Sequence, residues 1–295
     1  MPTVNDLVED AQSALRGYVR NQEQVTYLTA DVTETDTILQ VANGTRLSAG
    51  RVGIDNEILE IDSVDGTQVN VFPFGRGADG STAEPHAANS RVVANPLFPR
   101  FRVKQEVEES IRSVATQVPG IATMEFEYTP SVGGFNLPED FAQVVNVQAE
   151  VPGLPDSWKV LRRYKVEKQA DTTDFAGGNA LKIGSGAWPG MRVKVTYTRT
   201  APTEISLDDD FVTDFGMRQT CRDVIVQGAV ARILSMEDIS RLDPSSVQAL
   251  LVDEKRMPGA SNRIVAQLWA IYRERLAEER ALFLNQNPTG IRYER

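Results

Sequence analysis

The stretch that decides the β-rich part of the fold is Ile58-Leu59-Glu60-Ile61-Asp62-Ser63-Val64-Asp65-Gly66-Thr67-Gln68-Val69-Asn70-Val71. Its two ends, 58–61 and 68–71, carry apolar and β-branched residues at the spacing that is typical of strands. Asp65-Gly66 lies between them and favours a tight turn, because glycine adopts a positive φ without strain. The stretch therefore predicts a β-hairpin.

Strand-like patterning continues on the N-terminal side of this hairpin. Thr37, Leu39 and Val41 recur at every second position, as in a strand with one buried face. On the C-terminal side, residues 75–90 are rich in Gly and Ala and have no apolar period, so we expect an irregular loop there. Together these segments predict a small β-domain at residues 26–97, inserted after an N-terminal helix.

Helical spacing of apolar residues flanks this β-domain and returns near the C-terminus. We predict helices at 3–19, 103–118, 214–235 and 261–284. Strand-like runs, separated by Pro and Gly, occupy 125–128, 143–149, 158–162, 181–183 and 192–197. The predicted fold class is α+β, with a helical core, the inserted β-domain and a second β-rich region. The predicted organisation is an N-terminal core helix at 1–25, the inserted β-domain at 26–97, an α+β core at 98–284 and an extended tail at 285–295.

Composition narrows the classes of function. The 295 residues include 31 basic and 41 acidic ones, for a formal net charge of −10. This charge argues against a general nucleic-acid binder and against a polybasic membrane-surface protein, since both need clustered Lys and Arg. The sequence shows no signal peptide and no apolar run of membrane-spanning length. The single cysteine, Cys221, excludes an intrachain disulfide and fits synthesis at a reducing site such as a cytoplasm.

Few residues in the chain could carry catalysis or hold a cofactor. With one histidine and one cysteine, the usual zinc sites are nearly excluded, and no Gly-x-Ser-x-Gly elbow or phosphate-binding Gly-x-x-x-x-Gly-Lys loop is present. His86 lies in a loop, where an anchoring role through hydrogen bonds is favoured over a catalytic one. We therefore expect a non-enzymatic protein without a cofactor or metal.

The acidic run Asp208-Asp209-Asp210 has two interpretations. Carboxylates can bind calcium or magnesium, but this run lacks the alternation and central glycine of a calcium loop. Acidic residues just before a helix also stabilise its N-terminal dipole, and this interpretation is favoured because a helix is predicted from Asp214. A third use, facing a DNA passage or a basic neighbouring protein, stays a hypothesis.

Two stretches resemble structural proteins of bacteriophage virions. The segment 74–88, Phe-Gly-Arg-Gly-Ala-Asp-Gly-Ser-Thr-Ala-Glu-Pro-His-Ala-Ala, resembles a loop that closes small β-modules in phage connector, tail and baseplate proteins. Its matching positions include Arg76, Thr82 and His86. Over roughly 100–285, the order of Phe-Asn-Leu-Pro-Glu-Asp-Phe, Trp-Pro-Gly, a central helix and a charged final helix resembles head-to-tail adaptor (connector) proteins of siphophages.

The resemblance implies a ring, usually of twelve subunits, in the neck of the virion. Such a ring joins the portal protein to the downstream neck, stopper or tail protein, and each subunit contacts further copies of the same chain. DNA passes through the ring without specific binding, and no contact with a membrane is expected. Short adaptors are mostly helical, so other virion parts stay open, namely a tail terminator, a baseplate protein or a head-decoration protein. A carboxylate-based hydrolase is a more distant alternative.

The C-terminal tail is the expected portal-binding segment. Pro288 and Gly290 end the last helix, and Ile291 and Tyr293 then alternate with Arg292 and Glu294 at strand spacing. Such a segment can add to an exposed sheet edge on a partner. We expect four residues to bind the portal, namely Ile291, Arg292, Tyr293 and Arg295. The other interpretation is a frayed terminus.

Overall fold

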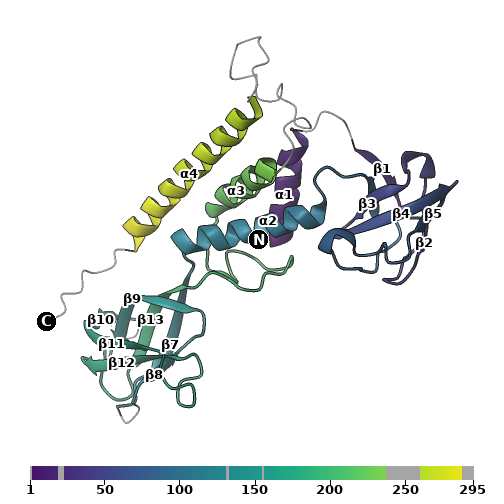
Figure 1. Ribbon diagram of the computed structural model, residues 1–295. Coiled ribbons are helices and arrows are strands. Elements are labelled where there is room, and N and C mark those ends of the chain that lie inside the picture. Colours follow the sequence, from purple (N-terminus) through teal and green to yellow (C-terminus); the bar gives the residue numbers. More distant parts are fainter. Residues whose placement is uncertain (1, 19–22, 131–132, 155, 237–259, 288–295) are drawn as a thin grey trace. The chain divides into compact units, whose positions relative to one another are not determined.

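The computed structural model describes residues 2–18, 23–130, 133–154, 156–236 and 260–287, and it confirms the α+β fold class (Figure 1). The chain divides into two compact units, which interleave along the sequence. The first unit is Met1–Val4, Ile111–Val224 and Arg273–Arg295, and the second is Asn5–Ser110 and Ile225–Tyr272. Each unit has a β-rich part with its own apolar core.

The described helices are α1 (Val4–Arg16), α2 (Arg100–Gln117), α3 (Cys221–Met236) and α4 (Ala260–Gln286). Their apolar stripes are buried as the helical spacing predicts: Leu7 and Ala11 of α1, and Val103 and Val107 of α2, are fully buried. Arg100 at the start of α2 bonds to Glu9 and Asn5 of α1. Among the described residues, no helix is long and apolar enough to cross a membrane.

The β-domain belongs to the second unit and is one curled, antiparallel sheet. Its strands are β1 (Gln24–Tyr27), β2 (Ile38–Gln40), β3 (Gly50–Ile54), β4 (Glu57–Asp65), β5 (Gln68–Val71) and β6 (Arg91–Ala94), in the order β1-β6-β3-β4-β5-β2. The predicted hairpin is β4–β5, in which Asp65 pairs with Gln68 around Gly66. A bridge between Leu28 and Val41 brings the two edges together.

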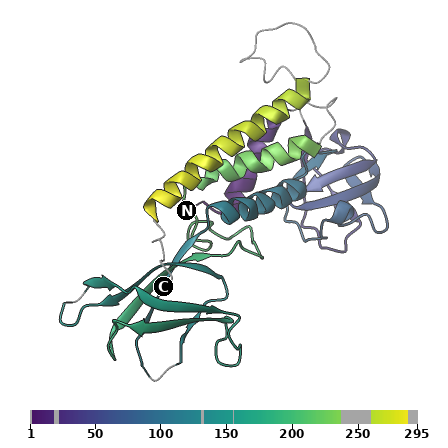
Figure 2. The ribbon, with the colours of Figure 1, turned by 60° about the vertical axis from the view of Figure 1, so that its left-hand side comes forward.

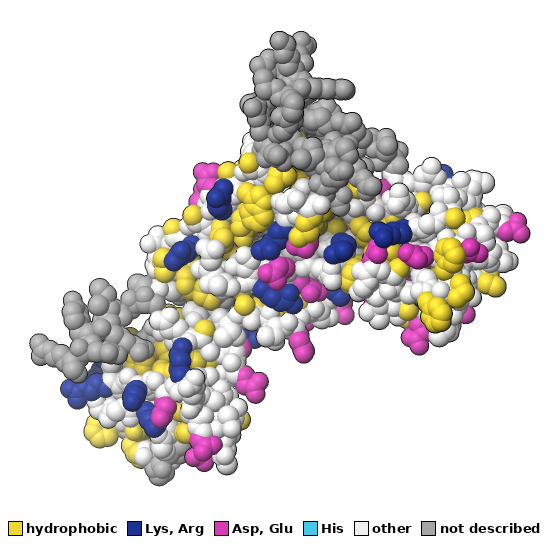
Figure 3. All heavy atoms as spheres, viewed as in Figure 1, with side chains coloured by type: hydrophobic (Ala, Val, Ile, Leu, Met, Phe, Trp, Pro, Cys, Tyr) yellow, Lys and Arg dark blue, Asp and Glu magenta, His cyan; other side chains and the backbone are white. Residues whose placement is uncertain are grey.

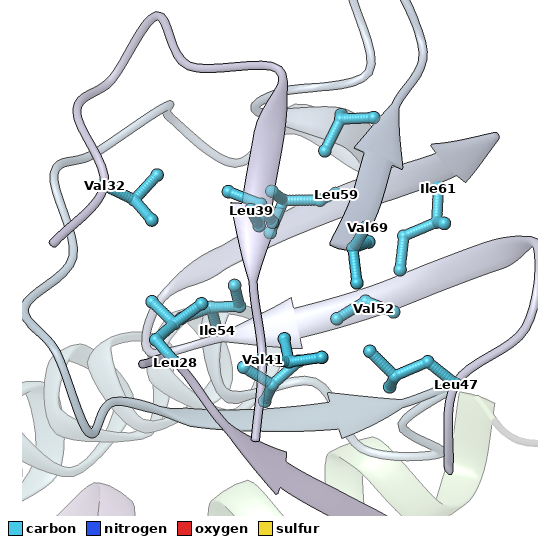
Figure 4. Packing of buried hydrophobic residues seen from close by; sticks show 12 residues of the cluster. Leu28, Val32, Leu39, Val41, Leu47, Val52, Ile54, Leu59, Ile61 and Val69 are labelled. Atoms are coloured by element: carbon cyan, nitrogen blue, oxygen red, sulfur yellow. The ribbon is translucent and has the colours of Figure 1, made fainter. Parts of the chain in front are cut away.

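A single apolar cluster fills the inside of this sheet (Figure 4). Leu39 of β2, Leu59 and Ile61 of β4, and Val69 of β5 point into it and are almost completely buried. Full burial of side chains of this size contributes about 1.5–3 kcal/mol each, so the alternating pattern stabilises the β-domain from within. The sheet begins at Gln24, two residues before the boundary that the sequence pattern predicts.

The second β-rich region belongs to the first unit and contains two small sheets around one core. Their strands are β7 (Ile121–Glu127), β8 (Phe135–Leu137), β9 (Phe141–Glu150), β10 (Trp158–Val160), β11 (Arg163–Lys168), β12 (Asn179–Ser185) and β13 (Arg192–Arg199). The sheets run β10-β9-β13-β7 and β11-β12-β8. Leu137 and Leu181 from the smaller sheet share a buried cluster with Val147 and Val195 from the larger one.

The predicted helix 214–235 is wrong at its beginning, because α3 begins at Cys221. The segment before it forms turns instead. Asp210 Oδ1 accepts the N–H groups of Val212 and Thr213, which satisfies them outside a helix. Gly216 then has φ +67°, a left-handed conformation that interrupts helical geometry, and a Cβ there would meet the backbone of Ile121.

Gly228 allows the close helix packing that the sequence indicates. Within the second unit, a Cβ at Gly228 would lie 2.8 Å from Cε2 of Tyr272 in α4 and closer still to the hydroxyl of Ser110 in α2. Figure 2 shows α3 alongside α4, as does Figure 1. The Ser110 hydroxyl also donates to the carbonyl of Ile225 at 2.8 Å, so three helices meet at this point.

Candidate functional site

Glu57 is the centre of the most highly connected polar cluster in the β-domain. Its side chain is buried, and its Oε1 accepts Nε of Arg76 at 2.7 Å and the N–H of Gly77 at 2.9 Å. Its Oε2 is 2.8 Å from Nη2 of Arg76, 2.8 Å from Nε2 of His86 and 3.2 Å from the N–H of Glu84. The carboxylate therefore joins four residues of the 75–90 loop to the start of β4.

Arg76 uses all five of its N–H groups inside the β-domain. Besides the two bonds to Glu57, its Nη1 donates to the carbonyls of Thr33 at 2.7 Å and Asp36 at 2.9 Å. Its Nη2 also donates to the carbonyl of Glu84 at 2.8 Å. A planar guanidinium held in this way has one orientation, so Arg76 fixes the loop against the 33–36 segment.

His86 is held between two carboxylates. Its Nδ1 lies 3.0 Å from Oδ2 of Asp55 and its Nε2 lies 2.8 Å from Oε2 of Glu57. Burial alone would lower the pKa of His86, but the hydrogen bonds that its ring donates to both carboxylates outweigh burial and raise that pKa to about 9. The imidazole is therefore charged at neutral pH, with both nitrogens donating and no lone pair left to act as a base.

The pKa of Glu57 shifts in the opposite direction. Burial alone would raise its pKa, but the hydrogen bonds from Arg76, His86 and the backbone N–H groups outweigh burial and lower the pKa to about 2. The hydrogen bond with His86 also lowers the pKa of Asp55. Two carboxylates and two cations thus stay ionised together, which is how buried charges become tolerable.

This cluster anchors the loop and leaves no group in it positioned for acid–base chemistry. Asp55 and Glu57 bind opposite nitrogens of His86, so the three cannot converge on one ion. The described residues contain no group of three or more His, Cys, Asp or Glu side chains that could hold a metal. Of the three loop residues singled out from the sequence, the structure brings Arg76 and His86 together, whereas Thr82 is exposed.

Asp55 and Glu57 were not predicted from the sequence, although the position of Glu57 within its strand indicates that its side chain is buried. Glu57, Leu59 and Ile61 occupy alternate positions of one strand, and the two apolar members are fully buried. A carboxylate in register with the core face needs buried partners. That register predicts that a cation from elsewhere in the chain, here Arg76, reaches the same side of the sheet.

The anchored loop begins with an aromatic turn. Phe72 accepts the N–H of Gly75 at 2.8 Å, so residues 72–75 form a β-turn with Pro73 and Phe74 at its centre. Proline requires a negative φ and Phe74 has φ +68°, a combination that defines a type II turn. The N–H of Phe72 donates to the carbonyl of Glu60 at 3.0 Å, and the N–H of Glu60 donates to the carbonyl of Gly75 at 2.8 Å, so the turn is held on β4. Phe74 is 101% exposed.

The acidic run lies in the first unit, and two of its three carboxylates hold the turns that precede α3. Asp209 Oδ2 accepts the N–H of Ser206 at 2.7 Å, and Asp210 Oδ1 accepts two N–H groups that follow it. Asp208 is exposed. The expectation that the run stabilises the beginning of a helix is therefore wrong, because ten residues separate Asp210 from the first full turn of α3 at Cys221–Val224.

Comparison of the sequence with models of protein families and with curated proteins found no match. The four tail residues expected to bind the portal, Ile291, Arg292, Tyr293 and Arg295, lie outside the described residues. Only the first part of the predicted 285–295 tail is described, and α4 continues through it to Gln286.

The remaining candidates are structural or lie on the surface. Cys221 is fully buried, and burial raises the pKa of its thiol to about 11, which makes it unreactive. Trp158 lies under the charged groups of Arg192 and Lys194, at 5.5 and 5.0 Å from its ring centre. Trp188 is exposed on a surface turn before β13.

Proposed function

We propose that this chain is a structural protein of the neck of a tailed phage. In this role its copies form a ring, dodecameric as in the adaptors that it resembles, between the portal protein and the next neck or tail protein. The mechanism is mechanical and electrostatic, without bond chemistry. The assignment to the neck rests on the sequence resemblance, and the assembly role is supported by the geometry of the β-domain.

The observation that carries the assembly role is the use of buried charge around Glu57. In most enzymes, buried ionisable groups line a pocket where they meet a substrate. In this β-domain Arg76 and His86 instead form their hydrogen bonds with carboxylates and backbone carbonyls of the same domain. Their effect is to hold a surface turn, and that turn displays a fully exposed phenylalanine.

Charge supports the channel part of the proposal. The chain carries an excess of ten acidic residues, which disfavours adhesion of DNA that passes through a ring. Asp208 is exposed, and among the described residues its carboxylate is free of the local backbone bonds that Asp209 and Asp210 accept, which supports Asp208 as the member of the acidic run that faces a passage or a basic neighbour in this proposal. The carboxylates of Asp209 and Asp210 instead accept backbone N–H groups of neighbouring residues.

A tail-side virion protein is the second candidate, and the strand content favours it. Strands make up 31% of the structure and helices 30%, whereas short adaptors are mostly helical. A tail terminator or baseplate protein with inserted β-modules would account for both β-rich regions. The partner protein distinguishes the two, because a neck adaptor binds the portal and a tail protein does not.

Binding to the portal tests the proposal. The full chain is mixed with the portal protein encoded in the same genome, and the complex is isolated and weighed by native mass spectrometry. We expect several copies of the chain on each portal ring. Absence of a portal complex, together with binding to a tail tube or baseplate protein, would replace the neck assignment with the tail-side candidate.

A further inference from the structure

Phe74 occupies a position that suits it poorly within its own chain. The third position of a type II turn favours glycine or asparagine, since any other side chain is strained at positive φ. Scattered exposed apolar residues need no explanation, but Phe74 combines full exposure with φ +68°. A strained residue that packs against nothing in its own fold gains nothing from it, so its contribution lies in contact with another molecule.

The turn holds Phe74 firmly enough for such a contact. A Cβ at Gly75 would lie 2.7 Å from the carbonyl of Glu60 and 3.0 Å from that of Phe72, so glycine lets the turn sit directly on β4. Arg76, the next residue, is fixed by its five hydrogen bonds. Phe72, at the first position of the turn, is also exposed and widens the apolar tip.

We propose that this aromatic tip, Phe72 and Phe74, inserts into an apolar pocket on a second copy of the same chain. The pocket lies among α1, α3 and α4 in the second unit and has a volume of about 470 Å³. Its lining residues are Ala14, Gly17, Tyr18, Val226, Gln227, Val230, Leu268 and Ile271. A cavity of about 150 Å³ already accepts one benzene ring, so two phenyl rings fit. Figure 3 shows apolar side chains gathered on the surface of the helices.

Hydrogen bonding supports the same pairing. Oε1 of Gln227 is buried in the pocket wall and has no hydrogen-bond partner among the residues that the structure describes. No hydrogen bond from the N–H of Phe74 occurs within the described residues, so this donor is available to a partner. The tip therefore brings an apolar ring and a donor to a pocket that offers apolar walls and an acceptor.

A contact between two different surfaces of one chain is a head-to-tail contact, and repeated head-to-tail contacts close into a ring when the rotation allows it. The inference rests on the proposed ring-forming function, because it names the contact that joins neighbouring subunits. The contact also explains why the buried charged side chains of the β-domain all hold one loop in place. The loop is then the part that reaches the neighbouring subunit.

Photocrosslinking of the full chain tests the contact directly. Phe74 is replaced by p-benzoylphenylalanine, which keeps an aromatic ring in the turn, and this protein is mixed with ¹⁵N-labelled unmodified chain at high concentration. After irradiation, mass spectrometry identifies the crosslinked peptides and whether they join two chains. We expect crosslinks between chains that end in α3 at Val226 or Val230, or in α4 at Leu268 or Ile271. Crosslinks within one chain, or from tip to tip, contradict the proposal.

Two variants with matched controls test it by sedimentation. Phe74→Asn should weaken self-association at least about tenfold, since buried aromatic anchors dominate interfaces, and Ile271→Glu should do the same from the pocket side. Tyr27→Thr removes another exposed aromatic of the β-domain, and Leu282→Glu places a charge elsewhere on α4; both should associate like the unchanged chain.

The outcomes separate this contact from the proposed function. If Phe74→Asn and Ile271→Glu assemble as well as the unchanged chain, the contact is wrong and ring formation stands on other surfaces. If the unchanged chain does not self-associate at any concentration and no crosslinks between chains form, the contact is also overturned. Binding to the portal is measured separately, so its loss or retention judges the neck assignment alone.

Discussion

Glu57 shows what sequence patterns leave out at the scale of a residue. Its partners Arg76 and His86 lie 19 and 29 positions further along the chain, and no local period connects them. The motif around Arg76 and His86 is visible in the sequence, but nothing nearby in the sequence distinguishes the carboxylate that joins them from the other acidic residues among the 41 in the chain. Long-range pairing of charges depends on the register of β4, which only the folded sheet supplies.

Glu57→Gln should destabilise the β-domain by about 3–5 kcal/mol. The substitution keeps the shape but leaves the buried charges of Arg76 and His86 without their shared carboxylate, and breaking a buried ion pair in this way is strongly unfavourable. Urea unfolding followed by circular dichroism measures the change. Glu60→Gln on the exposed face of the same strand is the control and should change the free energy by less than about 0.5 kcal/mol. Equal effects of the two variants would argue against a central role for Glu57.

The stability of the β-domain should depend on pH on both sides of a plateau. The pKa of His86 rises from 6.5 to about 9 on folding, so its stabilisation is complete below pH 6.5 and is lost as pH rises through 9. The pKa of Glu57 falls from 4.5 to about 2, so its stabilisation is complete above pH 4.5 and is lost as pH falls through 2. The free energy of unfolding is therefore expected to be highest between these limits.

The loss of stability at alkaline pH, the alkaline arm, is easier to measure than the loss at acidic pH. From about pH 6 to about pH 10 we expect a loss of about 3 kcal/mol, because a tenfold difference in proton affinity between the folded and unfolded chain corresponds to about 1.4 kcal/mol. His86→Gln should lower stability on the plateau and flatten this arm. An unchanged slope in His86→Gln would assign the alkaline loss to another group.

Phe74→Gly should raise the free energy of unfolding by about 1 kcal/mol. Glycine adopts φ +68° without the strain that an L-residue carries there, and the phenyl ring is fully exposed, so its removal loses no packing. Thermal unfolding of the full chain measures the difference. A loss of stability would show that Phe74 supports its own fold, which would remove the reason to seek an external partner for it.

At the scale of elements, strong periodicity was predictable and weak periodicity was not. The α1 stripe through Leu7 and Ala11 and the β4–β5 hairpin form as the sequence indicates, because one face of each is apolar. Strand β11 was missed, since four of its six residues are charged and only its pairing with β12 makes it a strand. The beginning of α3 was misplaced because Asp210 and Gly216 favour turns that apolar spacing does not reveal.

Gly228→Ala should destabilise the second unit by about 1–3 kcal/mol. In an exposed helix the same change would stabilise by about 1 kcal/mol through helix propensity, so the sign separates packing from propensity. The added methyl group has no room between Ser110 and Tyr272. Chemical unfolding gives the measurement, and Gln227→Ala, at the neighbouring position, controls for a general effect on α3. A stabilised Gly228→Ala protein would mean that the helices do not meet at this residue.

At the scale of the whole molecule, the α+β class was predictable and the division into units was not. Apolar periods identified two β-rich regions and the helices around them, and the structure gives each β-rich region its own core. The chain passes from one compact unit to the other within α1, α2, α3 and α4, after Val4, Ser110, Val224 and Tyr272. Such boundaries arise from tertiary contacts inside continuous helices, where the sequence pattern does not change.

Formation of a ring on the portal by copies of this chain is the central claim. The measurement that tests it most directly is a cryo-electron microscopy reconstruction of the full chain bound to the portal protein of the same phage. We predict a closed ring around an open channel, with the β-domain turn at Phe74 lying against α3 and α4 of the neighbouring copy. A portal that carries no density for the chain, or only isolated copies that do not touch each other, would contradict the claim.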